Sequence, residues 1–392
     1  MRKVTLVLLF IFSSQFSKAQ NPTNVITTAV PFLMVAGDAR SAGMGDNGVA
    51  TTADAFSQQY NPAKYAFSLE KQGFSASYTP YLTQLVNDIS LGQVTYYNRF
   101  KERSAVGASL RYFSLGEIQL TDINGEQLYI VKPNELALDV SYSLKLSDRF
   151  AMAVAGRFIS SNLRIQDGSN DNRAARSYAV DVAAFYQSEE MAFTDFNGRL
   201  RFGMNMQNLG PKINYDQTQN AENSNFLPSN LKIGSGFDFI LDDYNKVSLN
   251  VEFAKLLVPT PQQPKDLDGD GTISVAEREA SRLAYNKIGW SEGIFKSFND
   301  APGGLSEEFQ EITYAVGSEY TYQDSFAFRM GYFHESPAKG ARKYYTLGAG
   351  FTYNVVKIDL SYLFSASRVN NPLENTLRFS LTFNFGDKYE DY

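Results

Sequence analysis

The sequence predicts an all-β protein: a transmembrane antiparallel β-barrel of fourteen strands, with an N-terminal plug segment inside the lumen. Three observations lead to this fold class. The chain begins with an apolar segment typical of secreted proteins, it alternates apolar and polar residues in repeated stretches from about Gly73 onward, and a Gly- and Ala-rich stretch between these parts does not alternate. Strands with one apolar and one polar face are typical of barrels that stand between lipid and an aqueous lumen.

Residues 1–19 form a predicted signal peptide. Two basic residues precede an apolar run at 4–12, and a small-x-small cleavage site ends at Ala19. The apolar run is too short to span a bilayer, which disfavours the alternative of a membrane anchor. Cleavage removes three positive charges and takes the net charge from −6 to −9. A chain this acidic argues against nucleic acid as a partner.

The composition restricts the chemistry that the chain can perform. It contains no cysteine and a single histidine, His334, which excludes disulfide and thiol chemistry and any site that needs two imidazole groups. No apolar run beyond the signal peptide is long enough for a membrane helix. The 24 Tyr and 30 Phe, against one Trp, suit the aromatic girdles of a membrane barrel, although a soluble β-sandwich could also use them.

The strands are recognised by their period of two. In the last stretch, TLRFSLTFNF, Leu377 and Phe379 share one face, while Arg378 and Ser380 share the other. The same reading predicts fourteen strands, at 73–82, 89–98, 105–115, 135–146, 151–163, 175–187, 198–209, 230–241, 246–256, 311–322, 326–333, 343–354, 356–365 and 376–385.

The connections between these strands alternate between long and short. The long ones, which we assign to the cell surface, are 116–134, 164–174, 210–229, 257–310, 334–342 and 366–375. An outer-membrane barrel has long outer loops, short periplasmic turns and both termini in the periplasm, so residues 386–392 are a predicted periplasmic tail. Residues 188–197 are the exception, being too long for a tight turn. A large soluble β-sandwich, the alternative fold, predicts no such asymmetry.

Charged residues of both signs fall on the polar faces of the predicted strands. They are Arg111, Asp139, Arg157, Asp181, Arg201, Glu252, Glu319, Arg329, Asp359 and Arg378. Inside a barrel we expect them to bridge one another or to line water. A ring that selects ions is the less favoured interpretation.

Residues 20–70 precede the predicted barrel domain, 71–385, and do not alternate. They are dense in Gly and Ala, and Asn61-Pro62 begins a turn or a helix. Such a segment suits a compact plug folded inside the lumen. A phosphate-binding loop is disfavoured, because Gly43-Met44-Gly45 is not followed by the required Lys and Ser or Thr.

Three segments carry a resemblance to a known family. GMGDNGVAT at 43–51, NPAKYAF at 61–67 and NLGPKI at 208–213, together with the predicted fourteen strands, resemble the PorV family, also called LptO. These are FadL-like outer-membrane barrels that serve the type IX secretion system. The resemblance covers essentially the whole mature chain, and the N-terminal block is its most specific part. It implies an outer-membrane protein of a Gram-negative bacterium with loops at the cell surface and no enzymatic role.

The resemblance also implies partners. Members of this family bind secreted cargo through its C-terminal signal domain and take it from the large translocon barrel to the cell-surface attachment complex, which contains the sortase-like protein PorU. Outer-membrane lipid is the other expected partner. The alternative function is FadL-like transport of hydrophobic small molecules, for which residues 32–35 could line an apolar pocket. The same residues could equally form the core of the plug.

The longest predicted outer loop, 257–310, contains a calcium-type sequence. Twelve residues from Asp266 match the EF-hand pattern, with carboxylates at positions 1, 3 and 5, Gly at 6 and Glu at 12. The predicted ligands of a structural Ca²⁺ are Asp266, Asp268, Asp270, Thr272, Ser274 and Glu277. Prolines bar an entering helix, so only an exiting helix near 276–285 is expected. The alternative is an acidic, solvated turn without an ion.

No catalytic and no cofactor-binding residue is predicted. Acyl transfer usually needs a nucleophile, a base and an acid that orients the base. His334 lies in a predicted outer loop, and no Gly-x-Ser-x-Gly elbow precedes a helix. The sequence therefore favours a transport or binding role over catalysis.

Overall fold

The computed structural model describes residues 25–83, 85–163, 174–215, 224–367 and 372–389. The predicted signal peptide and most of the predicted loop 164–174 lie outside these residues. Among the residues described, no helix combines the length and the apolar character that crossing a membrane requires.

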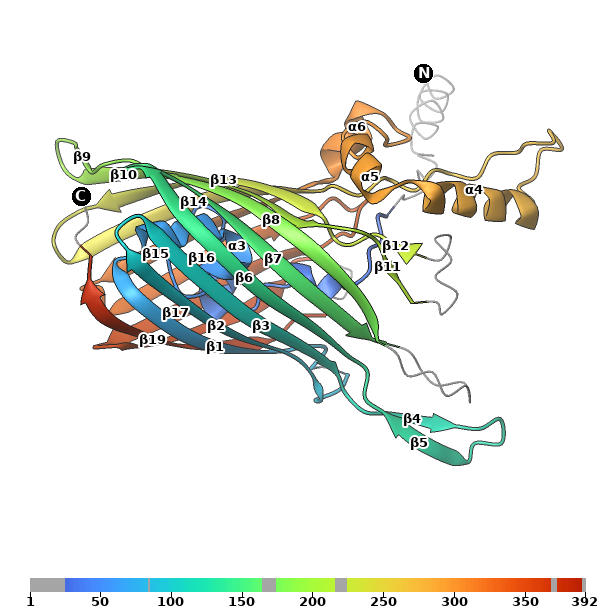
Figure 1. Ribbon diagram of the computed structural model, residues 1–392, viewed down its shortest axis with the longest axis horizontal. Coiled ribbons are helices and arrows are strands. Elements are labelled where there is room, and N and C mark those ends of the chain that lie inside the picture. The colour runs from blue at the N-terminus through green and yellow to red at the C-terminus, as the bar shows by residue number, and fades with distance from the viewer. Residues whose placement is uncertain (1–24, 84, 164–173, 216–223, 368–371, 390–392) are drawn as a thin grey trace, which may run out of the picture.

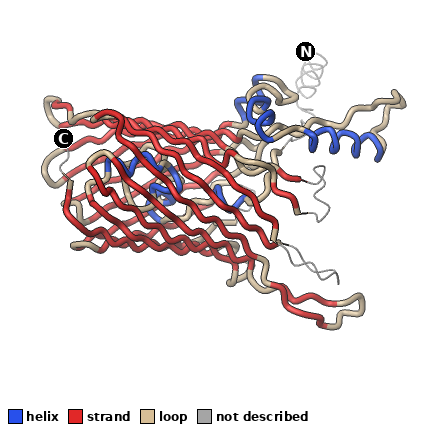
Figure 2. The backbone as a smooth tube through the Cα atoms, in the orientation of Figure 1, coloured by secondary structure: helices blue, strands red, loops and turns tan. Residues whose placement is uncertain are grey.

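Fourteen antiparallel strands form one closed barrel, which confirms the predicted fold class (Figures 1 and 2). In chain order they are β1 (Glu70–Pro80), β2 (Ile89–Lys101), β3 (Ser104–Leu115), β6 (Asn134–Ser147), β7 (Phe150–Asn162), β8 (Ala175–Gln187), β10 (Asn197–Leu209), β13 (Asn230–Ile240), β14 (Asn245–Leu256), β15 (Ile312–Tyr322), β16 (Phe326–His334), β17 (Lys343–Tyr353), β18 (Val356–Ser365) and β19 (Leu377–Lys388). The predicted strand ends are correct to within three residues. β19 continues into the stretch predicted as a periplasmic tail.

The barrel closes where the first strand meets the last. β1 pairs with β19, placing Phe74 opposite Phe383 and Ser75 opposite Thr382. An open sheet edge would leave backbone amides and carbonyls facing lipid without partners, at a cost of several kcal/mol for each group. Closure therefore satisfies the hydrogen-bonding groups of every wall strand.

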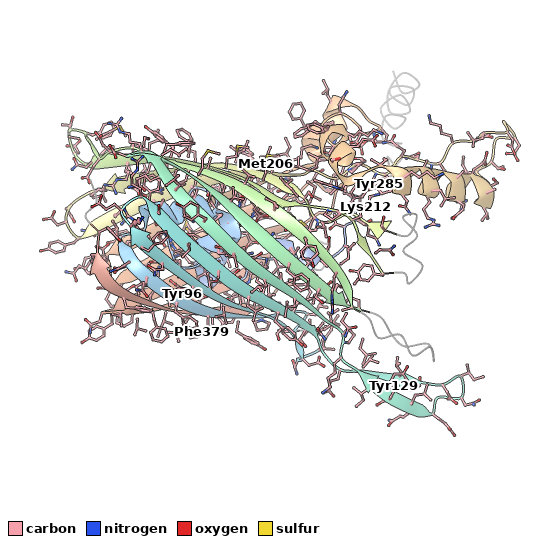
Figure 3. The ribbon with its side chains drawn as sticks, viewed as in Figure 1. Tyr96, Tyr129, Met206, Lys212, Tyr285 and Phe379 are labelled. Carbon is pink, nitrogen blue, oxygen red and sulfur yellow. The ribbon has the colours of Figure 1, made fainter. Side chains whose placement is uncertain are left out.

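The alternation of the sequence becomes an apolar outer belt and a polar interior. Along β6, the outward-facing Leu138, Val140 and Tyr142 are 46%, 58% and 47% exposed, whereas the inward-facing Asp139 and Ser141 are 1% and 3% exposed. Figure 3 shows other members of the outer belt, Tyr96 and Phe379, on the wall. The exposed apolar side chains are those that meet lipid in an outer-membrane barrel.

A chain segment of short helical turns lies inside this wall (Figures 1 and 2). It contains η1 (Pro31–Met34), α2 (Ala39–Ala42), α3 (Ser57–Tyr60) and η2 (Pro62–Phe67). Asp38 caps α2 by accepting a hydrogen bond from the Ser41 amide (2.9 Å), and Asn61 caps η2 by accepting one from the Ala63 amide (3.1 Å). We call residues 25–69 the N-terminal segment.

The N-terminal segment runs through the lumen from one end of the barrel to the other. At its start the Ala29 amide donates to the carbonyl of Phe226 (2.9 Å), in the predicted outer loop 210–229. At its end the Leu69 carbonyl accepts from the Tyr389 amide (2.7 Å), beside the C-terminal end of β19. The expectation that both termini lie in the periplasm is therefore wrong for the described N-terminal residues, because the segment crosses the lumen before β1 begins.

The outer loops contain more regular structure than the sequence predicts. The 257–310 loop forms α4 (Val275–Lys287), α5 (Trp290–Lys296) and α6 (Leu305–Gln310), of which only α4 is predicted. The 116–134 loop forms the hairpin β4 (Ile118–Thr121) and β5 (Gln127–Val131), and two residue pairs join β11 (Ile213–Asn214) to β12 (Ser224–Asn225). The long connection at 188–197 contains the short strand β9 (Met191–Ala192), which pairs with β10.

The position of Val25 gives a direct test of this topology. Val25 is 43% exposed and lies four residues before Ala29, so we expect Val25→Cys to react with a membrane-impermeant maleimide on intact cells. Asp243→Cys, in the exposed turn between β13 and β14, should react only after the outer membrane is opened. The absence of native cysteine makes the background clean. The reverse labelling pattern would contradict the assigned direction of the N-terminal segment.

Candidate functional site

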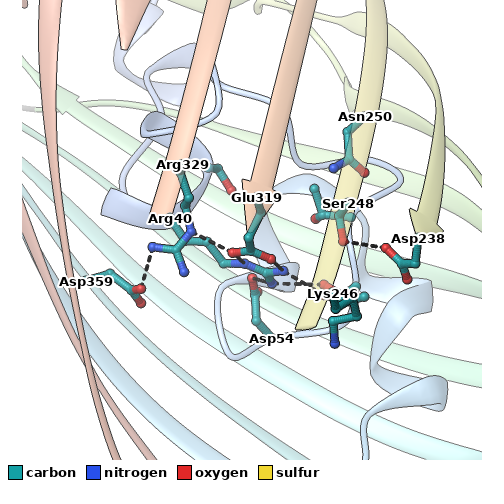
Figure 4. A network of polar contacts seen from close by, with 12 residues as sticks. Arg40, Asp54, Asp238, Lys246, Ser248, Asn250, Glu319, Arg329 and Asp359 are labelled. Atoms are coloured by element: carbon teal, nitrogen blue, oxygen red, sulfur yellow. Dashed lines mark hydrogen bonds and ion pairs between the residues drawn. The ribbon is translucent and has the colours of Figure 1, made fainter. Parts of the chain in front are cut away.

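A chain of alternating charges joins the N-terminal segment to the barrel wall (Figure 4). Arg40 of the segment pairs with Asp54 at 2.7 Å and with Glu319 of β15 at 2.8 Å. Glu319 also pairs with Arg329 of β16 at 2.6 Å, and Arg329 pairs with Asp359 of β18 at 2.7 Å. Each charge has at least one opposite charge within hydrogen-bonding distance, which offsets the cost of removing it from water.

A second group of ion pairs joins inward-facing charges on the strands from β6 to β13. Arg157 of β7 pairs with Asp139 of β6 and, at 3.0 Å, with Asp181 of β8. Asp181 also accepts a hydrogen bond from the backbone amide of Asn208 at 2.7 Å. On β10, Arg201 pairs with Asp238 of β13. These contacts confirm the prediction that the inward-facing charges bridge one another.

Two inward-facing charges bind backbone of the N-terminal segment. Arg111 donates to the carbonyls of Phe32 (2.7 Å), Leu33 (2.9 Å) and Val35 (2.8 Å). In the same way, Glu252 accepts from the amides of residues 48 and 49, at 2.8 and 2.9 Å. A side chain that binds backbone fixes the path of a segment whatever its sequence, and the strand pattern alone does not reveal this role for either residue.

The glycines at 43 and 45 allow the segment to touch the wall. A Cβ at Gly45, which has a φ of +72°, would lie 2.8 Å from the backbone oxygen of Tyr332. The wall supplies matching glycines, since a Cβ at Gly331 would lie 2.1 Å from the Gly45 amide nitrogen and one at Gly317 would lie 2.5 Å from the Met44 oxygen. Gly43 and Gly45 are thus explained by backbone packed on backbone.

Two further aspartates of the segment bind tyrosine hydroxyls. Asp38 accepts from the hydroxyl of Tyr60 at 2.7 Å. Asp46 accepts from the hydroxyl of Tyr344 of β17 at 2.6 Å and pairs with Arg378 of β19 at 3.2 Å. Asp38, Asp46 and Asp54, which recur every eight residues in the sequence, are therefore separate anchoring points rather than one shared site.

Two cavities beside the N-terminal segment differ in character. The outer cavity, about 170 Å³, includes Met34, Lys232, Glu252 and Lys339 in its lining. The inner cavity, about 650 Å³, includes Arg40 among its lining residues together with residues of the short turns. The two cavities have no lining residue in common.

Phe32 and Leu33 fill space rather than line a cavity. Both are buried in a cluster with Leu91, Phe113 and Ile159 of the wall. The rings of Phe32 and Phe113 are stacked with centroids 6.1 Å apart. Of the residues proposed to form an apolar transport pocket, these two therefore belong to packed core.

The outer loops 210–229 and 257–310 contact each other at the outer end of the barrel. Lys212 donates to the carbonyl of Asn286 at 2.9 Å, and its ammonium lies 4.0 Å from the centroid of the Phe226 ring. Tyr285 of α4 packs its edge against the same ring and donates to the Pro259 carbonyl at 2.9 Å (Figure 3). Burial raises the pKa of the Tyr285 hydroxyl above its ordinary value. α4 is thus fixed to the 210–229 loop.

The calcium-type loop brings its three aspartates together. Asp266, Asp268 and Asp270 each offer a carboxylate oxygen, and these oxygens lie within 4.8 Å of one another. Gly269 and Gly271 take the left-handed conformation, with φ of +76° and +82°. The oxygen-only donor set suits Ca²⁺, so the residues present fit the ion.

The remaining predicted ligands lie at the start of α4. Ser274 and Glu277 form a reciprocal capping box, and the Glu277 carboxylate also accepts from the Leu267 amide at 2.5 Å. These bonds lower the pKa of Glu277 to about 2, with the bond from the Leu267 amide contributing most. The Thr272 hydroxyl donates to Asp270 at 2.8 Å. Glu277 therefore reaches back to the loop, but it is not part of the three-aspartate cluster.

The single histidine has a different position from the one predicted. His334 is the last residue of β16, where it pairs with Lys343, and does not lie in the following loop. Its ring stacks on Tyr314, with centroids 4.6 Å apart. The antiparallel pairing of β16 with β15 and β17 carries the strand one residue further than the alternation indicates.

The family model described as type IX secretion system protein PorV matches residues 17–263. The chain belongs to the PorV family. The match includes the N-terminal segment and the strands from β1 to β14, whereas the wall partners Glu319, Arg329 and Asp359 of the charge chain lie beyond it. This PorV-family protein is an outer-membrane β-barrel component of type IX secretion.

Solved structures similar to this PorV-family barrel are outer-membrane channels. A FadL homologue of Pseudomonas aeruginosa is 14% identical, with a TM-score of 0.44 over 90% of this chain and 99% of its own. The toluene transporter TbuX of Ralstonia pickettii is 12% identical, with a TM-score of 0.47 over 90% and 99%. The toluene transporter TodX of Pseudomonas putida is 12% identical, with a TM-score of 0.47 over 89% and 96%. No curated protein matches the chain.

The buried charge chain predicts a large difference between two arginine substitutions. Arg329→Met leaves Glu319 and Asp359 buried with fewer opposite charges, so we expect it to lower the free energy of unfolding by roughly 3–5 kcal/mol. Arg149→Met removes the exposed pair with Glu189 and should change it little. Denaturant unfolding in lipid vesicles, followed by circular dichroism, measures both. Equal stability of the two variants would show that the charge chain does not hold the barrel together.

Proposed function

We propose that this protein binds secreted cargo through the cargo's C-terminal signal domain and takes it from the translocon barrel to the attachment complex that contains the sortase-like PorU. One observation carries the proposal beyond membership of the family. The lumen is occupied by a segment anchored through buried ion pairs, including Arg40 with Glu319 and Asp46 with Arg378. The large free surfaces are therefore the outer loops, and binding of a protein partner takes place there.

The hairpin β4–β5 is the best candidate for this contact. It forms a sheet of its own that extends beyond the barrel (Figure 1). Ile123 is fully exposed at its tip, and Leu128, Tyr129 and Ile130 are exposed along β5. A two-stranded hairpin is marginally stable alone, and its open edges can pair with a strand of another protein. We infer that the hairpin adds to a β-domain of the cargo or the translocon.

Transport of hydrophobic molecules is the less favoured function. Such transport needs an apolar cavity, whereas the outer cavity is lined in part by Lys232, Glu252, Lys339 and Arg342. The apolar space beside it is filled by the packed core around Phe32.

Replacing the hairpin tests the proposed function. We expect a chain in which residues 118–131 are replaced by a short Gly-Ser linker to fold and reach the outer membrane, because these strands pair only with each other. Affinity purification from native membranes should then recover less cargo and translocon than the unaltered protein recovers, and secreted cargo should accumulate in the periplasm.

The matched control replaces residues 242–244, in the short turn at the opposite end of the barrel, with a segment of equal length. This control should secrete normally. Normal secretion by the hairpin replacement would contradict the proposed contact. Recovery of hydrophobic small molecules in place of proteins from the unaltered chain would favour transport instead.

We further propose that Asp266, Asp268, Asp270, Thr272, Ser274 and Glu277 bind a structural Ca²⁺. The three aspartates converge, and the Glu277 carboxylate reaches the start of the loop. Thr272 would contribute its backbone carbonyl, as the seventh position of such a loop does. Extracellular calcium is abundant enough to fill even a weak site of this type. The ion would hold the 257–310 loop in one conformation ahead of α4.

Chelation tests the calcium site. Removal of Ca²⁺ should increase proteolytic cleavage within 257–274, because the carboxylates then repel one another. Asp266→Asn combined with Glu277→Gln should show the same cleavage without chelation and lose calcium binding by calorimetry. Asp122→Asn, in the acidic turn of the β4–β5 hairpin, is the control and should bind calcium normally. Cleavage that is unaffected by chelation would contradict the proposal.

A further inference from the structure

The short helix α6 has an apolar side and an acidic side. Leu305 and Phe309, one turn apart, are 69% and 71% exposed. Glu307, opposite them, and Glu308, beside them, are bound by lysines of the barrel rim. The apolar face of α6 therefore points away from the rim that holds its acidic face.

The acidic face is fixed strongly enough to set the orientation of the helix. Lys255, at the outer end of β14, pairs with Glu308 at 3.0 Å and with Glu311 at 2.6 Å. Lys339, in the loop after β16, pairs with Glu307 at 2.5 Å and with Glu311 at 2.9 Å. Three carboxylates held by two lysines leave α6 little freedom to turn its apolar face inward.

The position of α6 relative to the wall identifies what its apolar face meets. In Figure 1, α5 and α6 stand outside the profile of the barrel wall, at the outer end of β13 and β14. A single residue, Glu311, separates α6 from the first residue of β15. The helix therefore stands at the outer end of the wall.

The wall directly after α6 carries an aromatic girdle. The ring of Tyr314 of β15 stacks on that of His334, with centroids 4.6 Å apart. The Tyr332 ring centroid lies 6.2 Å from that of Tyr314 and 5.0 Å from that of Tyr345 of β17. Such rings mark the level at which lipid hydrocarbon gives way to head groups. Phe309 precedes Tyr314 by five residues, which places it at or just beyond this level.

The neighbouring helix α5 also exposes apolar side chains. Trp290 and Phe295 are exposed on it, whereas Gly293 is packed closely against Phe226 and Pro259. Aromatic side chains on short helices beside a membrane are typical of interfacial anchors. The exposed apolar residues of this loop thus continue the lipid-facing belt of the barrel.

We propose that the apolar face of α6, formed by Leu305 and Phe309, lies in the outer leaflet of the outer membrane as an interfacial anchor for the 257–310 loop. The occupant of this face is lipid, because α6 stands at the outer end of the wall, one residue before β15, on which the lipid-facing aromatic girdle begins at Tyr314. The anchor fixes the height of the loop relative to the membrane. It depends only on the outer-membrane placement of the barrel and is independent of cargo binding and of calcium.

Fluorescent probes at single cysteines test the anchor. Leu305→Cys and Phe309→Cys, in the full chain reconstituted in phospholipid vesicles, are labelled with an environment-sensitive nitrobenzoxadiazole. Both positions are exposed, so folding should be unaffected. We expect blue-shifted emission, strong quenching by nitroxide-labelled lipid and weak quenching by iodide supplied on both sides of the vesicles.

The matched control is Ala280→Cys on α4, which is exposed in the same loop but lies away from the wall. Its probe should show aqueous emission and strong quenching by iodide. The proposal is overturned if the probes at 305 and 309 behave like the control. It is equally overturned if their emission shifts only when outer-membrane proteins are added, because the face would then bind protein.

Discussion

The pairing of buried charges between the N-terminal segment and the barrel wall is the constraint on which the structure depends. A barrel of fourteen strands encloses more space than its inward side chains fill, and its inner face must be polar because its outer face meets lipid. Inward charges such as Arg329 and Asp359 would be costly without partners or water. The segment supplies partners, among them Arg40 and Asp46, and occupies the space at the same time.

The wall could be predicted from the sequence almost completely. The alternation of apolar and polar residues within each strand reveals its two faces, so β6 or β19 can be recognised without knowledge of the neighbouring strands. The presence of inward charges could be predicted for the same reason. Their partners could not be predicted, because contact across a lumen depends on the closure of the whole barrel. Arg40 and Glu319, for example, lie 279 residues apart in the chain.

The loops show where local patterns fail. α5 and α6 are seven and six residues long, too short to display a helical period, and ion pairs with Lys255 and Lys339 orient α6. The β4–β5 hairpin has no buried face, so its residues show no clean alternation. The calcium-type sequence can be recognised because its predicted ligands all lie within the twelve residues from Asp266 to Glu277, and Gly269 and Gly271 set the turn locally.

The path of the N-terminal segment has a consequence for assembly. The segment begins at the outer mouth, contacts strands around the barrel and ends at β1. Along this path, backbone contacts such as that of Gly45 with Tyr332 of β16 leave no free space between the segment and the wall. Such a segment could not enter a closed barrel, because its charged side chains and those of the wall would be buried without partners during entry. The wall must instead form while the segment is already in place. Docking of the segment and closure of the β1–β19 pairing are therefore coupled steps of folding.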